Sequence, residues 1–249
     1  MIRPFIALLA VTALFSGCRN DSGIRGYWSE HPVDVEDYAA AEEVFADFAE
    51  LAVQAPLADA KVAVDRLLKK AAKDEVAFYI YADWMDRGFG AIASPCHSCP
   101  IYVYAVDKML RQGILSDGAA ERYALRRESC LHNQVGAAVE LPEMKDADGM
   151  PVEYTPGVRT LFLLVDQNCP SCRGTMQLFD TPRWADTALV ALCYGYGPLP
   201  DLPQWTCYRI GSEQLFLDLR EAPYYFVAAA DGSIEITYTS AHNAYEESF

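Results

Sequence analysis

Two cysteines separated by two residues give the clearest chemical signal in the chain, the sequence C-P-S-C at positions 169–172. A pair with this spacing can bind zinc, form a structural disulfide, or cycle between dithiol and disulfide. The wholly apolar segment 161–165 predicts a strand buried on both faces, and segment 171–179 has a helical pattern. The motif therefore follows a buried strand and opens a helix, a context that favours the redox alternative.

The start of a helix predicts different roles for the two thiols. Its unpaired N–H groups and partial positive charge favour thiolate, and such motifs lower cysteine pKa values from about 8.5 to ~3.5–7.5. Pro170 suits the first helical turn because it has no N–H that needs a partner. We expect Cys169 to be the exposed nucleophile and Cys172, one turn inside, to be the resolving thiol. A bridge without turnover and a zinc site are the alternatives, although this part of the chain has no second ligand pair.

This arrangement resembles the thioredoxin superfamily. The resemblance is carried by the strand, the C-P-S-C motif and the helix, and by the segment EAPYYFVAAADGSI at 221–234. In that segment a strand follows Pro223 and ends at an Asp-Gly hairpin turn. The resemblance implies a cis peptide bond before Pro223, facing the cysteines, and cis bonds are nearly confined to proline. It also implies that the backbone of Ala222 hydrogen-bonds to substrate.

Two residues depart from the superfamily pattern. Asn168 precedes the first cysteine, where members usually have tryptophan. Leu163 stands six residues before the first cysteine, in place of a buried acid that helps to deprotonate the resolving thiol. Asp166 is the nearest acid and the candidate to replace it. These differences bear on redox potential and efficiency rather than on the fold.

A change in the hydrophobic pattern along the chain, from helical spacing to short strand-like segments, predicts two domains. Apolar residues at helical spacing predict five helices between about His31 and Gln134, and hence a small all-α bundle over 31–143. A charged, Gly-ended segment at 145–149 is a linker or a hairpin turn. Beyond it we expect an α/β thioredoxin-like domain over 150–249, whose strands include 161–165, 187–193 and the hairpin 224–228 and 234–238.

The first residues predict export and a lipid anchor. Arg3, an apolar run at 5–15 and small residues at 16–17 form a secretory signal peptide over 1–17, and the run is too short to span a bilayer. Cys18 directly after the small residues resembles the bacterial lipobox, which implies acylation of its thiol. Residues 18–30 are expected to form a tether. The alternative is an ordinary secreted protein. With the helical domain, this order also resembles envelope lipoproteins of anaerobic Gram-negative bacteria.

The composition excludes some partners. The chain has 35 acidic and 20 basic residues and a formal net charge of −15, so nucleic acid and anionic lipid would be repelled. A hydrophobic content of 52% and an aromatic content of 12% indicate packed cores rather than disorder.

Five further cysteines are candidates for structural disulfides in an oxidising envelope. Cys193 and Cys207, at the end of a strand and in the following crossover, either pair or stay separate buried thiols. Cys130 is expected to pair with Cys96 or Cys99. The alternatives for these last three are a zinc site that includes His132 and a relay that passes electrons to the C-P-S-C pair.

The sequence therefore predicts a cell-envelope thiol–disulfide oxidoreductase, lipid-anchored and located at the outer membrane on its periplasmic or surface face. Its partners would be protein thiols or disulfides and an upstream redox protein, with neither metal nor cofactor. The first rival is a non-catalytic thioredoxin-like binding or scaffold lipoprotein, and the second is a metal-binding lipoprotein.

Overall fold

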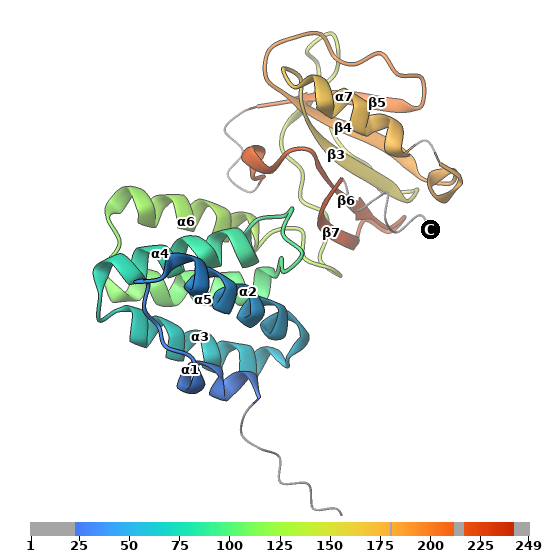
Figure 1. The fold of residues 1–249 in the computed structure, drawn as a ribbon. Coiled ribbons are helices and arrows are strands. Elements are labelled where there is room, and N and C mark those ends of the chain that lie inside the picture. The colour runs from blue at the N-terminus through green and yellow to red at the C-terminus, as the bar shows by residue number, and fades with distance from the viewer. Residues whose placement is uncertain (1–22, 180, 212–216, 242–249) are drawn as a thin grey trace, which may run out of the picture.

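The structure, a computed structural model, describes residues 23–179, 181–211 and 217–241. Figure 1 shows a helical domain beside a sheet domain. The predicted signal peptide and Cys18 lie outside the described residues. Among the described helices none is long and apolar enough to cross a membrane.

The five predicted helices are all present. They are α2 (Tyr38–Gln54), α3 (Leu57–Ala71), α4 (Glu75–Met85), α5 (Cys99–Gln112) and α6 (Asp117–Ser129). Asp37 and Asp74 cap the N-termini of α2 and α4 by accepting hydrogen bonds from backbone N–H groups, which such helix ends require.

Helix α4 was predicted to stop before Gly88. In the structure α4 continues directly into a π-helical turn, η2 (Asp86–Gly90), which includes Gly88. A Cβ atom at Gly90 would lie 2.7 Å from the Tyr102 ring and 2.8 Å from the Arg126 side chain. Glycine at this position therefore lets η2 lie directly against α5 and α6.

The predicted tether is wrong for residues 23–30. This segment forms a short 3-10 turn, η1 (Ile24–Gly26), and helix α1 (Tyr27–Glu30), which belong to the helical domain. Trp28 is fully buried in the helical core, and the Tyr27 hydroxyl donates to the Val44 carbonyl oxygen at 2.7 Å. Burial of large aromatic surface favours packing over a solvated tether.

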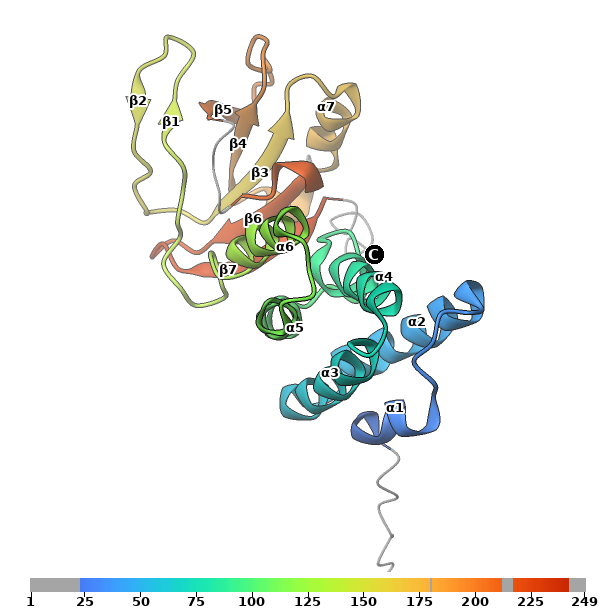
Figure 2. The ribbon, with the colours of Figure 1, turned by 90° about the vertical axis from the view of Figure 1, so that its left-hand side faces the viewer.

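Seven strands form one sheet in the order β2-β1-β5-β4-β3-β6-β7. Their bounds are β1 (Met144–Lys145), β2 (Pro151–Val152), β3 (Thr160–Asp166), β4 (Ala188–Tyr194), β5 (Trp205–Ile210), β6 (Tyr224–Ala228) and β7 (Ile234–Ser240). β3, β4 and β5 are parallel, whereas β6 and β7 are antiparallel to their neighbours. Figure 2 shows this sheet from the side.

Two expectations about the sheet are corrected. Segment 205–210 is strand β5 rather than part of a crossover, and it pairs with β4. The sheet domain also begins before residue 150, because β1 at 144–145 pairs with β5 and forms a hairpin with β2. β1 and β2 have two residues each, and the pairing of β1 with β5, a partner distant in sequence, joins this hairpin to the sheet.

The two faces of the sheet have separate cores. Helix α7 (Pro170–Met176) covers one face, where Leu161, Leu163 and Val165 of β3 are buried. The alternate residues Phe162 and Leu164 belong to the core on the other face, as the two-residue period of a strand requires.

The helical domain adds to this second core. Ile92, from the loop after η2, is buried in it. The Asn133 side chain donates to the Tyr238 hydroxyl of β7 at 2.9 Å, and the Thr237 hydroxyl donates to the Asn133 carbonyl oxygen at 2.9 Å. The domains are therefore packed together over the face of the sheet opposite α7.

Candidate active site at the carboxyl end of strand β3

Both cysteines of the motif lie where β3 ends and α7 begins. Cys169 is the N-cap residue of α7 and Pro170 is its first residue. The Cys169 N–H donates to the Asp166 carbonyl oxygen and the Cys172 N–H to the Cys169 carbonyl oxygen, both at 3.2 Å. Cys169 is partly exposed, whereas Cys172 has no exposed surface. Only Cys169 is therefore accessible to a protein substrate.

The environment of Cys172 keeps it protonated. Burial, followed by a hydrogen bond with the Cys169 sulfur, raises the pKa of Cys172 to about 12, and the charge of Asp166 acts in the same direction. At neutral pH the Cys172 thiol is thus the donor and the Cys169 sulfur the acceptor. The Asp166 carboxylate accepts a hydrogen bond from the Asn168 N–H at 2.8 Å, and its replacement of the acid missing at Leu163 stays a prediction.

The predicted substrate-binding residues lie at the same end of the sheet. The peptide bond between Ala222 and Pro223 is cis, as the resemblance implied. Leu164 of β3 pairs with Tyr224 of β6, and the strands are antiparallel. The residues just before Tyr224 therefore lie beside the end of β3, from which the cysteine loop departs.

Tyr194, which the sequence analysis missed, lies at the same end of the sheet as the motif, with its side chain packed against the core on the face opposite α7. It ends β4 beside Asp166, with which it pairs, and its hydroxyl donates to the Leu219 carbonyl oxygen at 2.7 Å. Burial first, and then the charges of Asp166 and both motif cysteines, raise its pKa. The available signal was its place as the last residue of an apolar strand parallel to β3.

Gly195 allows Asn168 to lie beside the motif. Gly195 has a φ of +93°, and a Cβ atom there would lie 2.6 Å from the Asn168 side-chain nitrogen. The Asn168 N–H donates to the Asp166 carboxylate at 2.8 Å. The residue that replaces the usual tryptophan therefore lies against the turn after β4.

The structure does not pair Cys193 with Cys207, which corrects the candidate bridge. Both are separate thiols, on the neighbouring strands β4 and β5. Cys207 is in register with Ala191 rather than with Cys193, so the two are offset by two residues. A hydrogen bond from Cys193 to Cys207, with burial, raises the pKa of Cys193, whereas the same bond lowers the pKa of Cys207.

Cys130 pairs with Cys99, one of the two partners expected, and their Cα atoms are 5.1 Å apart. The bridge joins the ends of α5 and α6 and uses two of the thiols that a zinc site would need. No group of three or more metal-ligating side chains occurs among the described residues. These cysteines belong to the helical core and the motif belongs to the core under α7, so the structure does not bring the two groups together.

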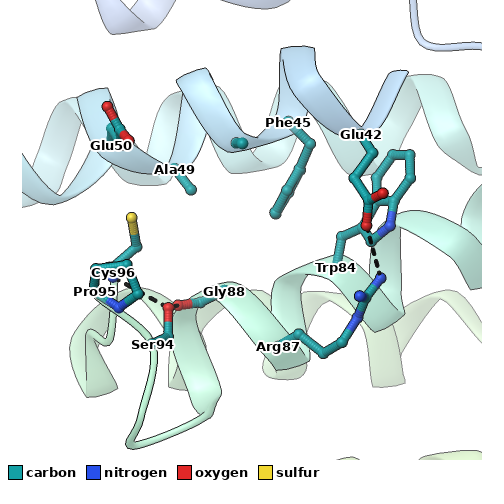
Figure 3. Close-up of a pocket in the computed structure, with 11 residues that line it drawn as sticks. Glu42, Phe45, Ala49, Glu50, Trp84, Arg87, Gly88, Ser94, Pro95 and Cys96 are labelled. Atoms are coloured by element: carbon teal, nitrogen blue, oxygen red, sulfur yellow. Dashed lines mark hydrogen bonds and ion pairs between the residues drawn. The ribbon is translucent and has the colours of Figure 1, made fainter. Parts of the chain in front are cut away.

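Cys96 is a separate, buried thiol. It lies at one end of a cavity of about 240 Å³, between α2 and the loop after η2 (Figure 3). Phe45 and Trp84 line the cavity, and an ion pair of Glu42 and Arg87, at 3.4 Å, lies at its other end. Burial, with the charge of Glu50, raises the pKa of Cys96, so it is not an activated thiol.

Comparison with protein-family models gave no match, and neither did comparison with curated proteins. Solved structures gave matches. A thioredoxin-like protein from Bacteroides caccae has a TM-score of 0.71 and 15% identity, with 90% of each chain covered. A domain of a possible thiol-disulfide isomerase from Cytophaga hutchinsonii has a TM-score of 0.36 and 16% identity, covering 47% of this chain and 96% of that one.

The thioredoxin domain of a thiol-disulfide oxidoreductase from Bacteroides vulgatus has a TM-score of 0.30 and 11% identity, covering 47% of this chain and 94% of that one. The Bacteroides caccae match carries the fold assignment. This chain has a thioredoxin-like fold preceded by a helical domain, and the likeness extends over both domains because 90% of each chain is covered.

Proposed function

We propose that the protein is a thiol–disulfide oxidoreductase of the cell envelope whose redox pair is Cys169 and Cys172. The observation that carries the proposal is the asymmetry of the pair. One sulfur is accessible, and the other is buried beneath it, protonated and hydrogen-bonded to it. A bridge with only a structural role requires no such difference.

The reduction of a protein disulfide then has two steps. The Cys169 thiolate attacks one substrate sulfur, which forms the mixed disulfide and releases the other substrate sulfur as a thiolate. Cys172 then loses its proton and attacks the Cys169 sulfur, which releases the second substrate thiolate. The substrate gains two electrons, and the protein is left with a Cys169–Cys172 disulfide. The reverse sequence oxidises a substrate dithiol, and an upstream dithiol or disulfide protein restores the pair.

Substrate binding is proposed for Ala222 and Pro223, which lie at the same end of the sheet as the cysteines. Their place at the start of β6 supports this role, because a segment of substrate could hydrogen-bond there to exposed backbone. Anchoring through Cys18, with an envelope location, is proposed on the apolar run and small residues that precede it.

The test is reduction of insulin disulfides by the purified protein, together with trapping by Cys172→Ser. That variant should accumulate mixed disulfides through Cys169, because the second step has lost its nucleophile. Cys96→Ser is the matched control, since it removes a buried thiol of the other domain and should turn over normally. A parent without turnover and a variant that traps nothing would instead favour the binding or scaffold role.

A further inference from the structure

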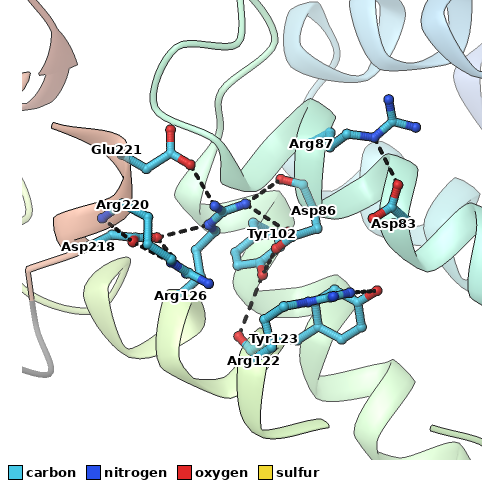
Figure 4. Close-up of polar contacts among 10 residues, drawn as sticks. All are labelled: Asp83, Asp86, Arg87, Tyr102, Arg122, Tyr123, Arg126, Asp218, Arg220 and Glu221. Atoms are coloured by element: carbon cyan, nitrogen blue, oxygen red, sulfur yellow. Dashed lines mark hydrogen bonds and ion pairs between the residues drawn. The ribbon is translucent and has the colours of Figure 1, made fainter. Parts of the chain in front are cut away.

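A buried arginine links the two domains. Arg126 of α6 has a side chain that is only 10% exposed, and its guanidinium forms ion pairs with three carboxylates. Asp86 of η2, at 2.8 Å, belongs to the helical domain. Asp218, at 3.1 Å, and Glu221, at 2.6 Å, belong to the sheet domain. Figure 4 shows the guanidinium between these groups.

The two acids of the sheet domain lie at the two ends of a short 3-10 turn, η5 (Leu219–Glu221): Asp218 is its N-cap and Glu221 is its last residue. The turn leads directly into Ala222 and Pro223. Asp218 caps this turn by accepting from the Arg220 N–H. The Arg126 contacts therefore lie one and four residues before the proposed substrate-binding backbone of Ala222.

The charges around this turn are nearly balanced. Asp218 is buried, which would raise its pKa, but hydrogen bonds and charges of Arg220 and then Arg126 lower it overall. The Arg220 side chain donates to Asp218 at 2.8 Å. On the other side, the Tyr102 hydroxyl donates to Asp86 at 2.5 Å. Without Arg126, buried carboxylates from both domains would face one another without a shared cation, an arrangement that is strongly unfavourable.

Two supports thus hold η5, one from each domain. The Tyr194 hydroxyl donates to the Leu219 carbonyl oxygen from the end of β4. Arg126, on α6, donates hydrogen bonds to Asp218 and Glu221, which lie before and after Leu219 in the chain. The guanidinium has a planar fork of donors, so it can fix several carboxylates in one geometry where a single ammonium could not.

We infer that Arg126 is a positioning residue for the substrate-binding segment, through which the helical domain sets the place of Ala222 relative to Cys169. This inference rests on the proposed function. The inference gives the helical domain a role in the reaction. The domain holds the proposed substrate-binding segment in place and takes no part in the electron transfer itself.

The test compares Arg126→Gln with Arg127→Gln in the full chain. Arg127 is the next residue of α6, and its ion pairs, with Asp107 at 2.7 Å and Glu128 at 3.8 Å, lie within the helical domain. Arg126→Gln should raise the KM for insulin about tenfold, the loss expected when hydrogen bonds to a charged group are removed. The alkylation rate of Cys169 should not change, because the cysteines are untouched. Arg127→Gln should leave both unchanged.

Amide hydrogen exchange supplies a readout that does not depend on turnover. Arg126→Gln should speed exchange in the peptide that contains residues 217–224, and Arg127→Gln should not. If Arg126→Gln fails to fold, Glu221→Gln, which keeps the Asp86 and Asp218 contacts, should show the same changes to a smaller extent.

The outcomes separate the two proposals. An active parent whose Arg126→Gln form keeps its KM and its exchange rates would overturn the positioning role. A lower melting temperature with both readouts unchanged would assign Arg126 to stability alone and also overturn it. An inactive parent in which amide exchange at residues 217–224 still depends on Arg126 would refute the proposed function but support the positioning of this segment by Arg126.

Discussion

Alkylation of the fully reduced protein should discriminate sharply between the two motif thiols. Burial and the hydrogen bond with the Cys169 sulfur raise the pKa of Cys172 to about 12 from the ordinary value of 9.0. Each pKa unit changes the ionised fraction about tenfold, so at pH 7 about one Cys172 in 100,000 is thiolate, against about one in 100 for an ordinary thiol. Because only the thiolate reacts, ionisation alone should slow labelling of Cys172 about 1,000-fold relative to an ordinary thiol.

The direction with pH follows from the same shift. The Cys172 rate should rise about tenfold per pH unit from pH 7 to about pH 11, since the ionised fraction grows over that whole range. The assay is reaction with iodoacetamide at a series of pH values, followed by mass spectrometry with fragmentation to separate positions 169 and 172. Cys169→Ser isolates Cys172, and burial should keep its pKa raised after the hydrogen bond is altered. Cys172→Ser isolates Cys169 and should still be labelled quickly.

Equal rates at the two positions at pH 7 would refute the assignment of nucleophile and resolving thiol. A Cys172 rate that levels off near pH 9 would also refute it, because it would mean that the buried environment does not protect the thiol.

Three further predictions concern other parts of the chain. Cys99→Ser should lower the free energy of unfolding of the helical domain by about 3–4 kcal/mol, because the lost bridge spans a sequence separation of 31 residues. Urea denaturation measures this loss, and adding reductant to the parent protein should reproduce it. A loss no larger than that of Cys96→Ser would contradict the prediction. Gly195→Ala should cost more than about 1 kcal/mol and slow the reaction of Cys169, because its φ of +93° and the nearby Asn168 side chain leave no room for a Cβ atom. Gly174→Ala, which meets no atom within 4 Å, is the control and should not destabilise. Cys18→Ser should move the protein from the membrane fraction to the soluble fraction, and a variant that still requires detergent after signal cleavage would refute the lipid anchor.

Local pattern was sufficient for the elements that position the motif. The apolar run at 161–165 and the C-P-S-C sequence predicted the strand, the cysteines and the helix in the right order. The Asp-Gly turn predicted the hairpin of β6 and β7, and helical periodicity predicted α2 to α6. These features depend on residues a few positions apart, so they are visible in a single sequence.

Contacts between distant segments were decided only by the tertiary structure. β1 is only two residues long, too short to have a distinctive pattern, and its pairing with β5, 60 or more residues away in the chain, defines it. The choice of Cys99 over Cys96 as partner of Cys130, and the two-residue offset between Cys193 and Cys207, depend on where whole elements lie. A disulfide needs its Cα atoms within a narrow range, which spacing along the chain does not report.

The buried charges show the same division most clearly. In the sequence, Arg126 is one of two adjacent arginines on a polar helix, and nothing distinguishes it from Arg127. In the structure it is the buried partner of acids 92 and 95 residues away, next to the segment that begins β6. The sequence by itself therefore determined that the cysteine pair lies between a buried strand and a helix. The docking of one domain on the other decided which charges surround the segment that leads into β6, because burial and ion pairing arise only when distant surfaces meet.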